Sequence, residues 1–217
     1  MKVADRVVVA TDSTQVAEAA RSAGAEVALT RADHPSGTDR VAEVAFQPAF
    51  EAYDIILNVQ GDEPFVSEEA LRAAAAFVQR GTYDLGTAAF VASSDILNDP
   101  SVVKVVSDAR DRVLYFSRAP VPFLRDAGDA NVRGPFVKQH VGVYAYSRAS
   151  LGRWVSLPPH PLEVIERLEQ LRPLADGLAM GVATVAAIEG AGIDTEADLT
   201  LANQRWFDTT PTVAGTH

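Results

Sequence analysis

The stretch DIILNVQGDEP, at residues 54–64, decides the fold that we expect for this chain. Its first half is apolar on successive residues, which is typical of a strand covered on both faces, since a half-exposed strand alternates apolar and polar residues. Its second half turns polar, with Gly61, Asp62 and Glu63 where the strand ends. Strands covered on both faces lie in sheets with helices on each side, so the stretch predicts an α/β protein.

Strands and helices alternate on both sides of this stretch. Residues 7–10, VVVA, form a second apolar run, and helices are expected over residues 13–23 and 67–80. This alternation predicts a mostly parallel central sheet. We expect further strands near residues 86–90, 102–107, 113–116, 141–146 and 182–186, and further helices near residues 161–172 and 195–206.

Composition and charge limit the classes of protein to which the chain can belong. The 217 residues are 47% hydrophobic and 22% charged, and no repeat or sharp change of composition divides them, so we expect one domain over residues 1–217. The formal net charge of −10 argues against a nucleic-acid partner and against a broad surface for anionic membranes. No apolar run reaches the roughly 18 residues of a membrane span, so no membrane insertion is expected.

The sequence holds no cysteine. This excludes a disulfide framework, a thiolate zinc site and a cysteine nucleophile, and it fits the cytoplasm as the compartment. The four histidines show no metal-ligand spacing. The sequence also lacks three motifs: a P-loop, the third glycine of a dinucleotide fingerprint and the nucleophile elbow of α/β-hydrolases. A P-loop site, a dinucleotide-binding site and an α/β-hydrolase site are therefore excluded.

Two acidic turns follow predicted strands and open predicted helices. Asp62 and Glu63 follow the strand at residues 54–59, and Asp194 lies in GAGIDT, at residues 190–195. Carboxylates at this edge of an α/β sheet can hold a divalent ion that bridges to phosphate, because ligands bind at the carboxyl ends of the strands. Each turn also fits a plainer interpretation, a solvated turn or a helix cap, and spacing alone does not separate the two.

The stretch TRADHPSGTDR, at residues 30–40, is dense in hydroxyl-bearing and cationic side chains. Ser36, Gly37 and Thr38 can present backbone amides and hydroxyls to a ribose or a base, at the N-terminus of a helix that suits anions. An ordinary capped surface loop is the alternative. A polar loop of this length is uncommon without a ligand, which favours a binding role.

Two further segments carry candidate site residues. In the strand that follows His140, alternation with a period of two places His140 and Tyr144 on one face. The predicted helix at residues 161–172 has an apolar stripe, and its other side carries Glu169 and Gln170. Packed core side chains in the strand and a solvated face on the helix are the alternatives to a binding role.

Six separated segments resemble, in the same order, the CMP-Kdo synthetases, which are 3-deoxy-manno-octulosonate (Kdo) cytidylyltransferases. The resemblance runs from about Arg6 to about Asn203, and it is specific because six motifs agree at once. The segments are VATD at residues 9–12, the stretch at residues 30–40, NVQGDEP at 58–64, YFSRAP at 115–120, LEQLR at 168–172 and GIDT at 192–195.

The resemblance implies a fold, a reaction and a set of site residues. The fold would be a three-layer α/β/α, Rossmann-like nucleotidyltransferase. The reaction would join CTP and Kdo into CMP-Kdo, with release of pyrophosphate, for lipopolysaccharide biosynthesis. Asp62 and Asp194 match the family's catalytic aspartates, which bind Mg²⁺. The nucleotide-binding loop is matched by Arg31, Ser36, Gly37 and Thr38, and the sugar-acid pocket by Gln60, Arg118, Arg125, His140, Tyr144, Glu169 and Gln170.

At its N-terminus, the sequence differs from the family. Its members begin with a further strand and a triphosphate-binding loop that this sequence does not match, so we expect an N-terminally truncated member whose sheet lacks the first strand. The polar stretch at residues 119–135 is expected to form a loop or a dimerisation arm, since the family is usually homodimeric. Two alternatives stay open: a nucleotidyltransferase for a related acidic sugar, and an inactive remnant that binds a nucleotide or a sugar.

Overall fold

The central layer of the molecule is a mixed sheet of six strands. Its strands are β3 (Ile55–Val59), β4 (Leu85–Val91), β5 (Lys104–Ser107), β6 (Val113–Ser117), β7 (Lys138–Ser147) and β8 (Met180–Val185). In the computed structural model, which describes residues 3–187, 192–193 and 195–209, the strands follow the order β6-β5-β7-β4-β8, and β3 also pairs with β7. β4 and β8 are parallel, whereas β7 runs antiparallel to β3, β4 and β5.

This arrangement confirms the predicted α/β class and corrects the predicted sheet. The sheet is mixed and not mostly parallel, because β7, its longest strand, opposes the direction of three neighbours. An apolar run on successive residues reports that both faces of a strand are covered, and it carries no information on the direction of the strands beside it.

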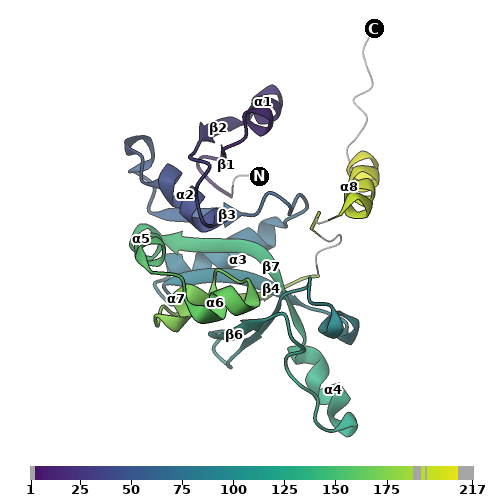
Figure 1. Cartoon of the computed structure of the whole chain (residues 1–217). Helices are drawn as coiled ribbons and strands as arrows, with labels where there is room; N and C mark the ends of the chain where they lie inside the picture. Colours follow the sequence, from purple (N-terminus) through teal and green to yellow (C-terminus); the bar gives the residue numbers. More distant parts are fainter. Residues whose placement is uncertain (1–2, 188–191, 194, 210–217) are drawn as a thin grey trace.

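The first two strands form a separate parallel pair. β1 (Val8–Thr11) and β2 (Glu26–Leu29) are connected by α1 (Thr14–Ser22) and hydrogen-bond to each other, and they pair with no other described strand. Figure 1 shows this pair above the six-stranded sheet. β2 is not evident from the sequence, because its four residues are too short a run to show a period and its two end residues are exposed.

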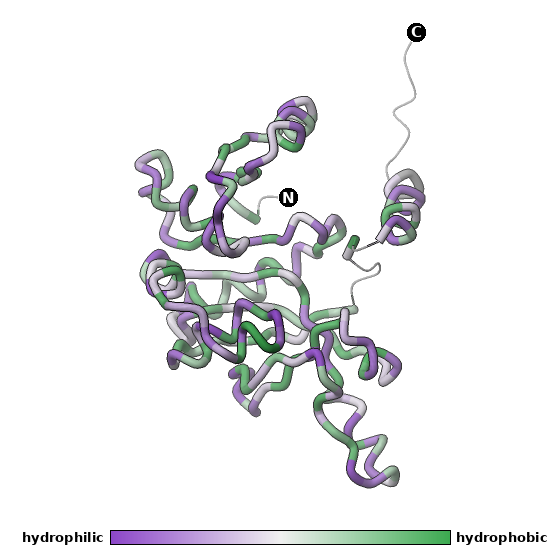
Figure 2. Tube along the Cα trace, in the orientation of Figure 1, coloured by the Kyte–Doolittle hydropathy of each residue, from purple (hydrophilic) through white to green (hydrophobic). Residues whose placement is uncertain are grey.

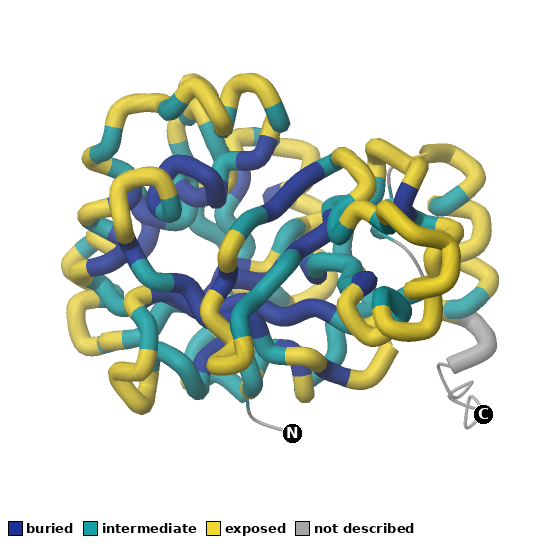
Figure 3. Tube along the Cα trace, turned by 90° about the horizontal axis from the view of Figure 1, so that it is seen from below, coloured by how far each residue is buried: buried dark blue, intermediate teal, exposed yellow. Residues whose placement is uncertain are grey.

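Helices cover both faces of the six-stranded sheet (Figure 1), and the buried residues lie mainly in the interior between them (Figure 3). α3 (Glu68–Gln79) packs on one face through buried alanines, against Val143 and Ala145 of β7. Tyr144 and Tyr146 of β7 face the opposite side, where they pack in a second hydrophobic cluster. The helices of that side are α2 (Gly37–Ala45), α5 (Arg148–Ser156) and α7 (Leu171–Ala175). The two clusters share no residue, which confirms the three-layer α/β/α arrangement.

α3 approaches the sheet most closely at Gly86 of β4. A Cβ atom built on Gly86 would lie 2.0 Å from the carbonyl oxygen of Ala74. This distance is far shorter than a van der Waals contact, and the opposing atom belongs to the helix backbone, which cannot turn away as a side chain can. The packing of helix on sheet therefore requires glycine at this position.

The predicted helix at residues 161–172 is divided into two. α6 (Pro161–Glu166) ends at Arg167, whose φ of 55° is left-handed, and α7 begins only at Leu171. Leucine and isoleucine recur at helical spacing across the break, which is why the sequence resembled one helix. Leu168 and Leu171 are buried, whereas Leu162 and Ile165 of α6 are exposed, so the expected apolar stripe is wrong for α6. Glu169 and Gln170 consequently lie in the connection between the helices, where Gln170 is buried, and not on a solvated helix face.

The remaining elements are short helices and the last helix of the chain. Residues 119–135 project from the sheet as an arm (Figure 1), in which apolar and polar residues are interspersed (Figure 2). No described helix is both long enough and apolar enough to cross a membrane. These elements are η1 (Pro48–Phe50), η2 (Ser94–Asn98), η3 (Ala127–Asp129), α4 (Ala130–Arg133), η4 (Gly134–Phe136) and α8 (Glu196–Thr209).

Candidate functional site

The loop before α2 is fixed by its own N-cap. The Ser36 hydroxyl accepts a hydrogen bond from the amide of Asp39 at 3.3 Å and donates one to the carboxylate of Asp39 at 2.6 Å. α2 then begins at Gly37, where a Cβ atom would lie 3.7 Å from the amide group of the Gln60 side chain. The start of α2 and the end of β3 therefore lie in contact, as the proposed grouping of Gly37 and Gln60 requires.

The turn after β3 folds over the middle of β7. The amide of Gln60 donates to the carbonyl oxygen of Gly142 at 3.1 Å. A Cβ atom on Gly142 would lie 3.1 Å from the side chains of both Gln60 and Glu63. Gly142 thus leaves the space in which this turn packs, and a side chain here would push the turn away from β7.

The same turn contacts the segment that precedes α8. The amide of Ile193 donates to the carbonyl oxygen of Asp62 at 2.8 Å, and a Cβ atom on Gly192 would lie 3.4 Å from a carboxylate oxygen of Glu63. The side chain of Asp62 is exposed. Asp194, the second predicted metal ligand, lies outside the described residues. Among the residues that are described, no group of three or more His, Asp or Glu side chains could hold a metal ion.

A chain of buried polar groups links β3, β7, α2 and the α6–α7 connection. The side-chain amide of Asn58 lies 3.3 Å from the hydroxyl of Tyr146, which lies 3.3 Å from the hydroxyl of Thr38. Thr38 in turn donates to Oε1 of Glu169 at 3.1 Å. The Oε2 atom of Glu169 is buried and has no hydrogen-bond partner among the described residues. An acceptor left open in this way is available to a donor group of a ligand.

Burial shifts the pKa values of the titratable groups in and beside this chain of polar side chains. It raises the pKa of Glu169, because the charged carboxylate loses its hydration, and the nearby Ser36 and Thr38 lower this pKa by a smaller amount. It also raises the pKa of Tyr146 and that of Tyr144, so both phenols stay protonated. The chain therefore consists of neutral hydroxyls around one carboxylate whose charge is costly to keep.

His140 and Tyr144 lie together on β7, as the alternation predicts. Their ring centroids are 5.3 Å apart, and the ring of Phe116 lies 5.0 Å from that of His140. The Thr87 hydroxyl donates to the carbonyl oxygen of Val143 at 2.6 Å, so at 2.9 Å it must accept from Nε2 of His140. Burial lowers the pKa of His140 to about 3, which keeps the imidazole neutral.

Arg118, one of two arginines predicted to bind the sugar acid, has main-chain partners. Its Nε donates to the carbonyl oxygen of Glu166 at 2.8 Å, and one Nη1 bond reaches that of Pro100 at 2.7 Å. Weaker bonds reach Ser101 and Arg167. The arginine therefore ties the end of β6 to the end of α6 and to the loop before β5.

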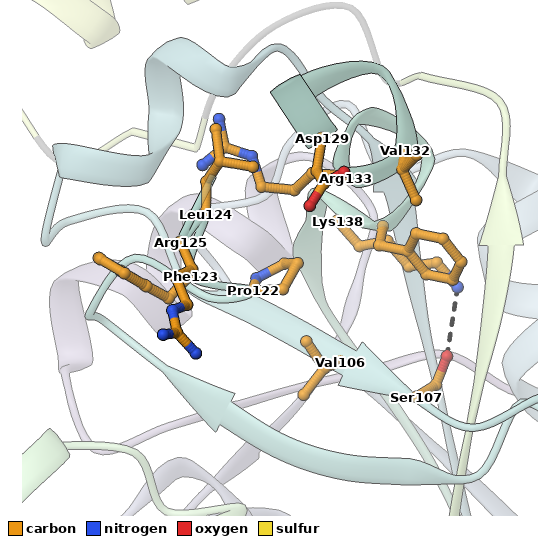
Figure 4. A pocket seen from close by; sticks show the side chains of 11 residues that line it. Val106, Ser107, Pro122, Phe123, Leu124, Arg125, Asp129, Val132, Arg133 and Lys138 are labelled. Carbon is orange, nitrogen blue, oxygen red and sulfur yellow. Dashed lines mark hydrogen bonds between the residues drawn. The ribbon is translucent and has the colours of Figure 1, made fainter. Parts of the chain in front are cut away.

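Arg125, the other arginine, lies in the arm. It lines a pocket of about 450 Å³ between the arm and strands β5 and β7, together with Arg133, Lys138, Asp129 and apolar side chains (Figure 4). Arg125 is exposed, and no other predicted site residue lines this pocket. Within the described residues, the structure therefore places Arg125 in a different surrounding from Gln60 and Glu169.

Two further cationic side chains, Arg31 and Lys104, differ in their surroundings. Arg31 is exposed, with Nε 3.6 Å from Asp33 and 3.8 Å from Glu43. Lys104 is fully buried and donates to three carbonyl oxygens at 2.6–2.8 Å, those of Asp99, Val102 and Arg118. Its surroundings lower its pKa through burial. Lys104 thus has a structural role: it connects the loop before β5 to the end of β6, where the arm begins.

The structure brings three further residues to the site. Asn58, Tyr146 and Thr87 are buried and bond to predicted site residues or support them. The alternation that joined His140 to Tyr144 extends by one step to Tyr146, so this residue could have been found. Asn58 and Thr87 lie on other strands, and only the pairing of these strands with β7 brings them to the site.

Known proteins resemble this chain over most of its length. A family model described as cytidylyltransferase matches residues 1–180. The 3-deoxy-manno-octulosonate cytidylyltransferase of Gemmatimonas aurantiaca is 64% identical over 204 residues, which are 94% of this chain and 79% of that protein. The protein of the same description from Yersinia pseudotuberculosis is 45% identical over 199 residues, 90% of this chain and 80% of its own length.

Solved structures resemble it as well. A CMP:2-keto-3-deoxy-manno-octonic acid synthetase in complex with CTP superposes with a TM-score of 0.84 at 35% sequence identity, over 94% of this chain and 82% of that one. The inositol-1-phosphate CTP transferase of T. maritima superposes with a TM-score of 0.59 at 14% identity, over 94% of this chain and 75% of its own. At that identity the second likeness shows a shared fold alone.

Proposed function

The chain belongs to the cytidylyltransferase family, and we propose that it activates Kdo with CTP to give CMP-Kdo and pyrophosphate. The observation that carries this proposal is the continuity of the site. The loop at Ser36–Thr38 bonds to Glu169 through Thr38, and its Gly37 lies beside the side chain of Gln60. A transfer between two substrates needs such adjacent surfaces, because the reacting groups must be held in line.

The nucleotide half of the proposed site is the loop that ends at α2. Gly37 and the hydroxyl of Ser36 lie at the start of a nine-residue helix, whose N-terminal amides favour anionic or polar ligand groups. Arg31 is exposed beside this loop and can approach a phosphate or the cytosine edge. Thr38 is buried below them and bonds to Glu169, so this residue joins the two halves.

The sugar-acid half is the surface around Glu169. Its open Oε2 atom accepts a hydroxyl of the sugar, for which a buried acceptor without a partner is the appropriate group. Gln60, Gln170, His140 and Tyr144 complete this half. Arg125 is left out of it, because it lines the separate pocket at the arm. The attacking anomeric hydroxyl forms a bond to the α-phosphorus of CTP, loses its proton and displaces pyrophosphate.

Asp62 and Asp194 are the proposed ligands of Mg²⁺. The fit rests on the donor set: Asp62 presents an exposed carboxylate, and the backbone at Gly192–Ile193 lies against its turn. Hard carboxylate oxygens suit Mg²⁺, which would neutralise charge on the phosphates when bound. Asp62 sits where the strand β3 ends, the edge of an α/β sheet at which ligands bind.

A pyrophosphate-release assay with the purified 217-residue chain tests the proposal. Release that needs CTP, Kdo and Mg²⁺ together supports it. Faster release with another acidic sugar than with Kdo would favour the nucleotidyltransferase for a related sugar. Binding of CTP or Kdo in calorimetry without any release would favour the inactive remnant.

We further propose that the arm at residues 119–135 joins two copies of the chain. Phe123 is 81% exposed and Val132 is 67% exposed on the arm, although both are large apolar side chains. Sedimentation should show a dimer for the native chain and a monomer for Phe123→Glu. Ile165→Glu is the matched control, because Ile165 is 76% exposed on α6, outside the arm. A native monomer would refute the proposal.

The cytoplasm is the compartment that we propose for the protein. The absence of cysteine from the sequence fits a reducing compartment, and nucleoside triphosphates are available there. Cell fractionation of a tagged chain tests the assignment, and recovery with periplasmic markers would contradict it.

A further inference from the structure

Tyr146 occupies the centre of the buried polar chain, between the two halves of the proposed site. Its hydroxyl lies 3.3 Å from Nδ2 of Asn58 and 3.3 Å from Oγ1 of Thr38. Asn58 belongs to β3, which leads to the turn of Asp62, and Thr38 belongs to the nucleotide half. Tyr146 itself is fully buried. One phenol thus contacts both segments without reaching the surface.

The direction of each hydrogen bond in this chain follows from the number of protons available. Thr38 has one hydroxyl proton, and it goes to Oε1 of Glu169, which can only accept when ionised. Toward Tyr146, Thr38 must therefore accept, and the phenol donates. The side-chain amide of Asn58 donates to the phenol oxygen. The chain runs in one direction, from Asn58 through Tyr146 and Thr38 to Glu169.

The surroundings of Tyr146 fix its hydroxyl in place. The ring of Trp154 packs edge-on against that of Tyr146, with centroids 5.4 Å apart, and the ring of Tyr144 stacks at 6.2 Å. All three side chains are at most 4% exposed. A phenol packed on both sides in this way has a fixed position, so it can orient the hydroxyl of Thr38.

We propose that Tyr146 is a positioning residue that couples the nucleotide half to the sugar-acid half. By donating to Thr38, it directs the Thr38 proton to Oε1 of Glu169. Oε1 is thereby occupied, and Oε2 is held open for a hydroxyl of the sugar. Tyr146 acts through Thr38 and Glu169 and touches neither substrate. The inference rests on the proposed function, because it assigns a role within the same site.

Tyr146→Phe removes the hydroxyl and keeps the packed ring. We expect KM for Kdo to rise about tenfold, KM for CTP to rise less, and kcat to fall, because Thr38 loses the donor that orients it. Thr38→Val should cause a similar change. Thr38→Ser, which keeps the hydroxyl, should raise KM for Kdo less than Thr38→Val does. Tyr83→Phe is the matched control, since its hydroxyl bonds to a carbonyl oxygen of Arg110 outside the site.

A double-mutant cycle separates positioning from a general structural role. If the chain acts as one unit, Thr38→Val added to Tyr146→Phe should change KM for Kdo by less than about twofold further. Independent, multiplying losses would overturn the proposal, as would unchanged kinetics in Tyr146→Phe or an equal loss in Tyr83→Phe. Should Tyr146→Phe fail to fold, the comparison of Thr38→Val with Thr38→Ser still decides, because equal kinetics in these two variants would refute the directed chain.

Calorimetry distinguishes failure of this inference from failure of the proposed function. If the native chain binds neither CTP nor Kdo, the proposed function is wrong, and the inference falls with it. If the native chain binds both, and Tyr146→Phe binds Kdo as tightly as the native chain does, only the inference is wrong.

Discussion

The carbonyl oxygen of Asp62 accepts a hydrogen bond from the amide of Ile193 at 2.8 Å. This bond joins the turn after β3 to the segment before α8, two segments that are far apart in the sequence. The Cβ position of Gly192 lies 3.3 Å from the same oxygen, so two successive residues contact the turn. The bond places Ile193, which precedes the proposed metal ligand Asp194 in the sequence, against the turn of Asp62.

Asp62→Asn should reduce kcat for pyrophosphate release by about 100-fold or more, since an amide is a poor ligand for Mg²⁺. The thermal midpoint of unfolding should change little, because the Asp62 side chain is exposed. Asp194→Asn should behave alike. A continuous pyrophosphate assay and a magnesium titration by calorimetry measure the two effects.

Glu69→Gln is the control for this prediction. Glu69 is an exposed carboxylate in the first turn of α3 and is not among the proposed metal ligands. Its removal should leave both kcat and magnesium binding at native values. Native turnover in both aspartate variants would refute the metal assignment.

Glu169→Gln should stabilise the protein at pH 7 while it weakens Kdo binding. The folded state raises the pKa of Glu169 above its ordinary value of 4.5, so this group favours folding at low pH and opposes it once pH rises above the folded pKa. The glutamine of the variant does not ionise, so the variant does not lose stability as the pH rises. The difference in the free energy of unfolding between variant and native chain should therefore vanish below about pH 4.5, and urea titrations at several pH values would show it.

His140 should make the native chain less stable in acid. Its pKa is about 3 in the folded state against 6.5 ordinarily, so the unfolded state binds the additional proton between these values. Stability should be full above pH 6.5 and fall by about 1.4 kcal/mol per pH unit below it. His140→Gln, which can still donate to Thr87, should remove this contribution. Parallel acid dependence in both proteins would contradict the burial of the imidazole.

Arg118→Ala separates an anchoring role from a ligand-binding role. Because its guanidinium bonds to main-chain carbonyls, we expect the free energy of unfolding to fall by about 2 kcal/mol or more, and KM for CTP and Kdo to change together. Arg118→Lys should be more stable than Arg118→Ala and less stable than the native chain. The lysine ammonium group lacks the planar guanidinium that lets arginine bond to several carbonyl oxygens at once. A selective rise of KM for Kdo at native stability would instead place Arg118 on the sugar acid.

Gly86→Ala should unfold or severely destabilise the protein, by about 3 kcal/mol or more, because the new methyl group would overlap the carbonyl oxygen of Ala74. Circular dichroism during thermal unfolding measures this change. Gly134→Ala is the control, because a Cβ atom there has no neighbour within 4 Å. Equal midpoints for the two variants would show that α3 lies farther from β4 than the structure places it.

The sequence by itself determined the α/β class, most of the strands and the grouping of His140 with Tyr144. These features depend on local patterns: an apolar run reports two covered faces, and a period of two places alternate residues on one face. It also determined the family, because six motifs in order are a property of the sequence. It could not determine the direction of β7, since neither covered faces nor alternation depends on the direction of the neighbouring strands.

The tertiary structure alone decided which polar groups meet. Asn58 and Thr87 reach the site because β3 and β4 pair with β7, and Glu169 reaches Thr38 because Arg167 breaks a helix that the apolar stripe had made look continuous. The partners of Arg118 were equally hidden, since a cation can bond to a ligand or to main-chain carbonyls at the same place in the sequence. Hydrogen bonds need atoms within about 3 Å, and such distances between remote residues arise only when the chain has folded.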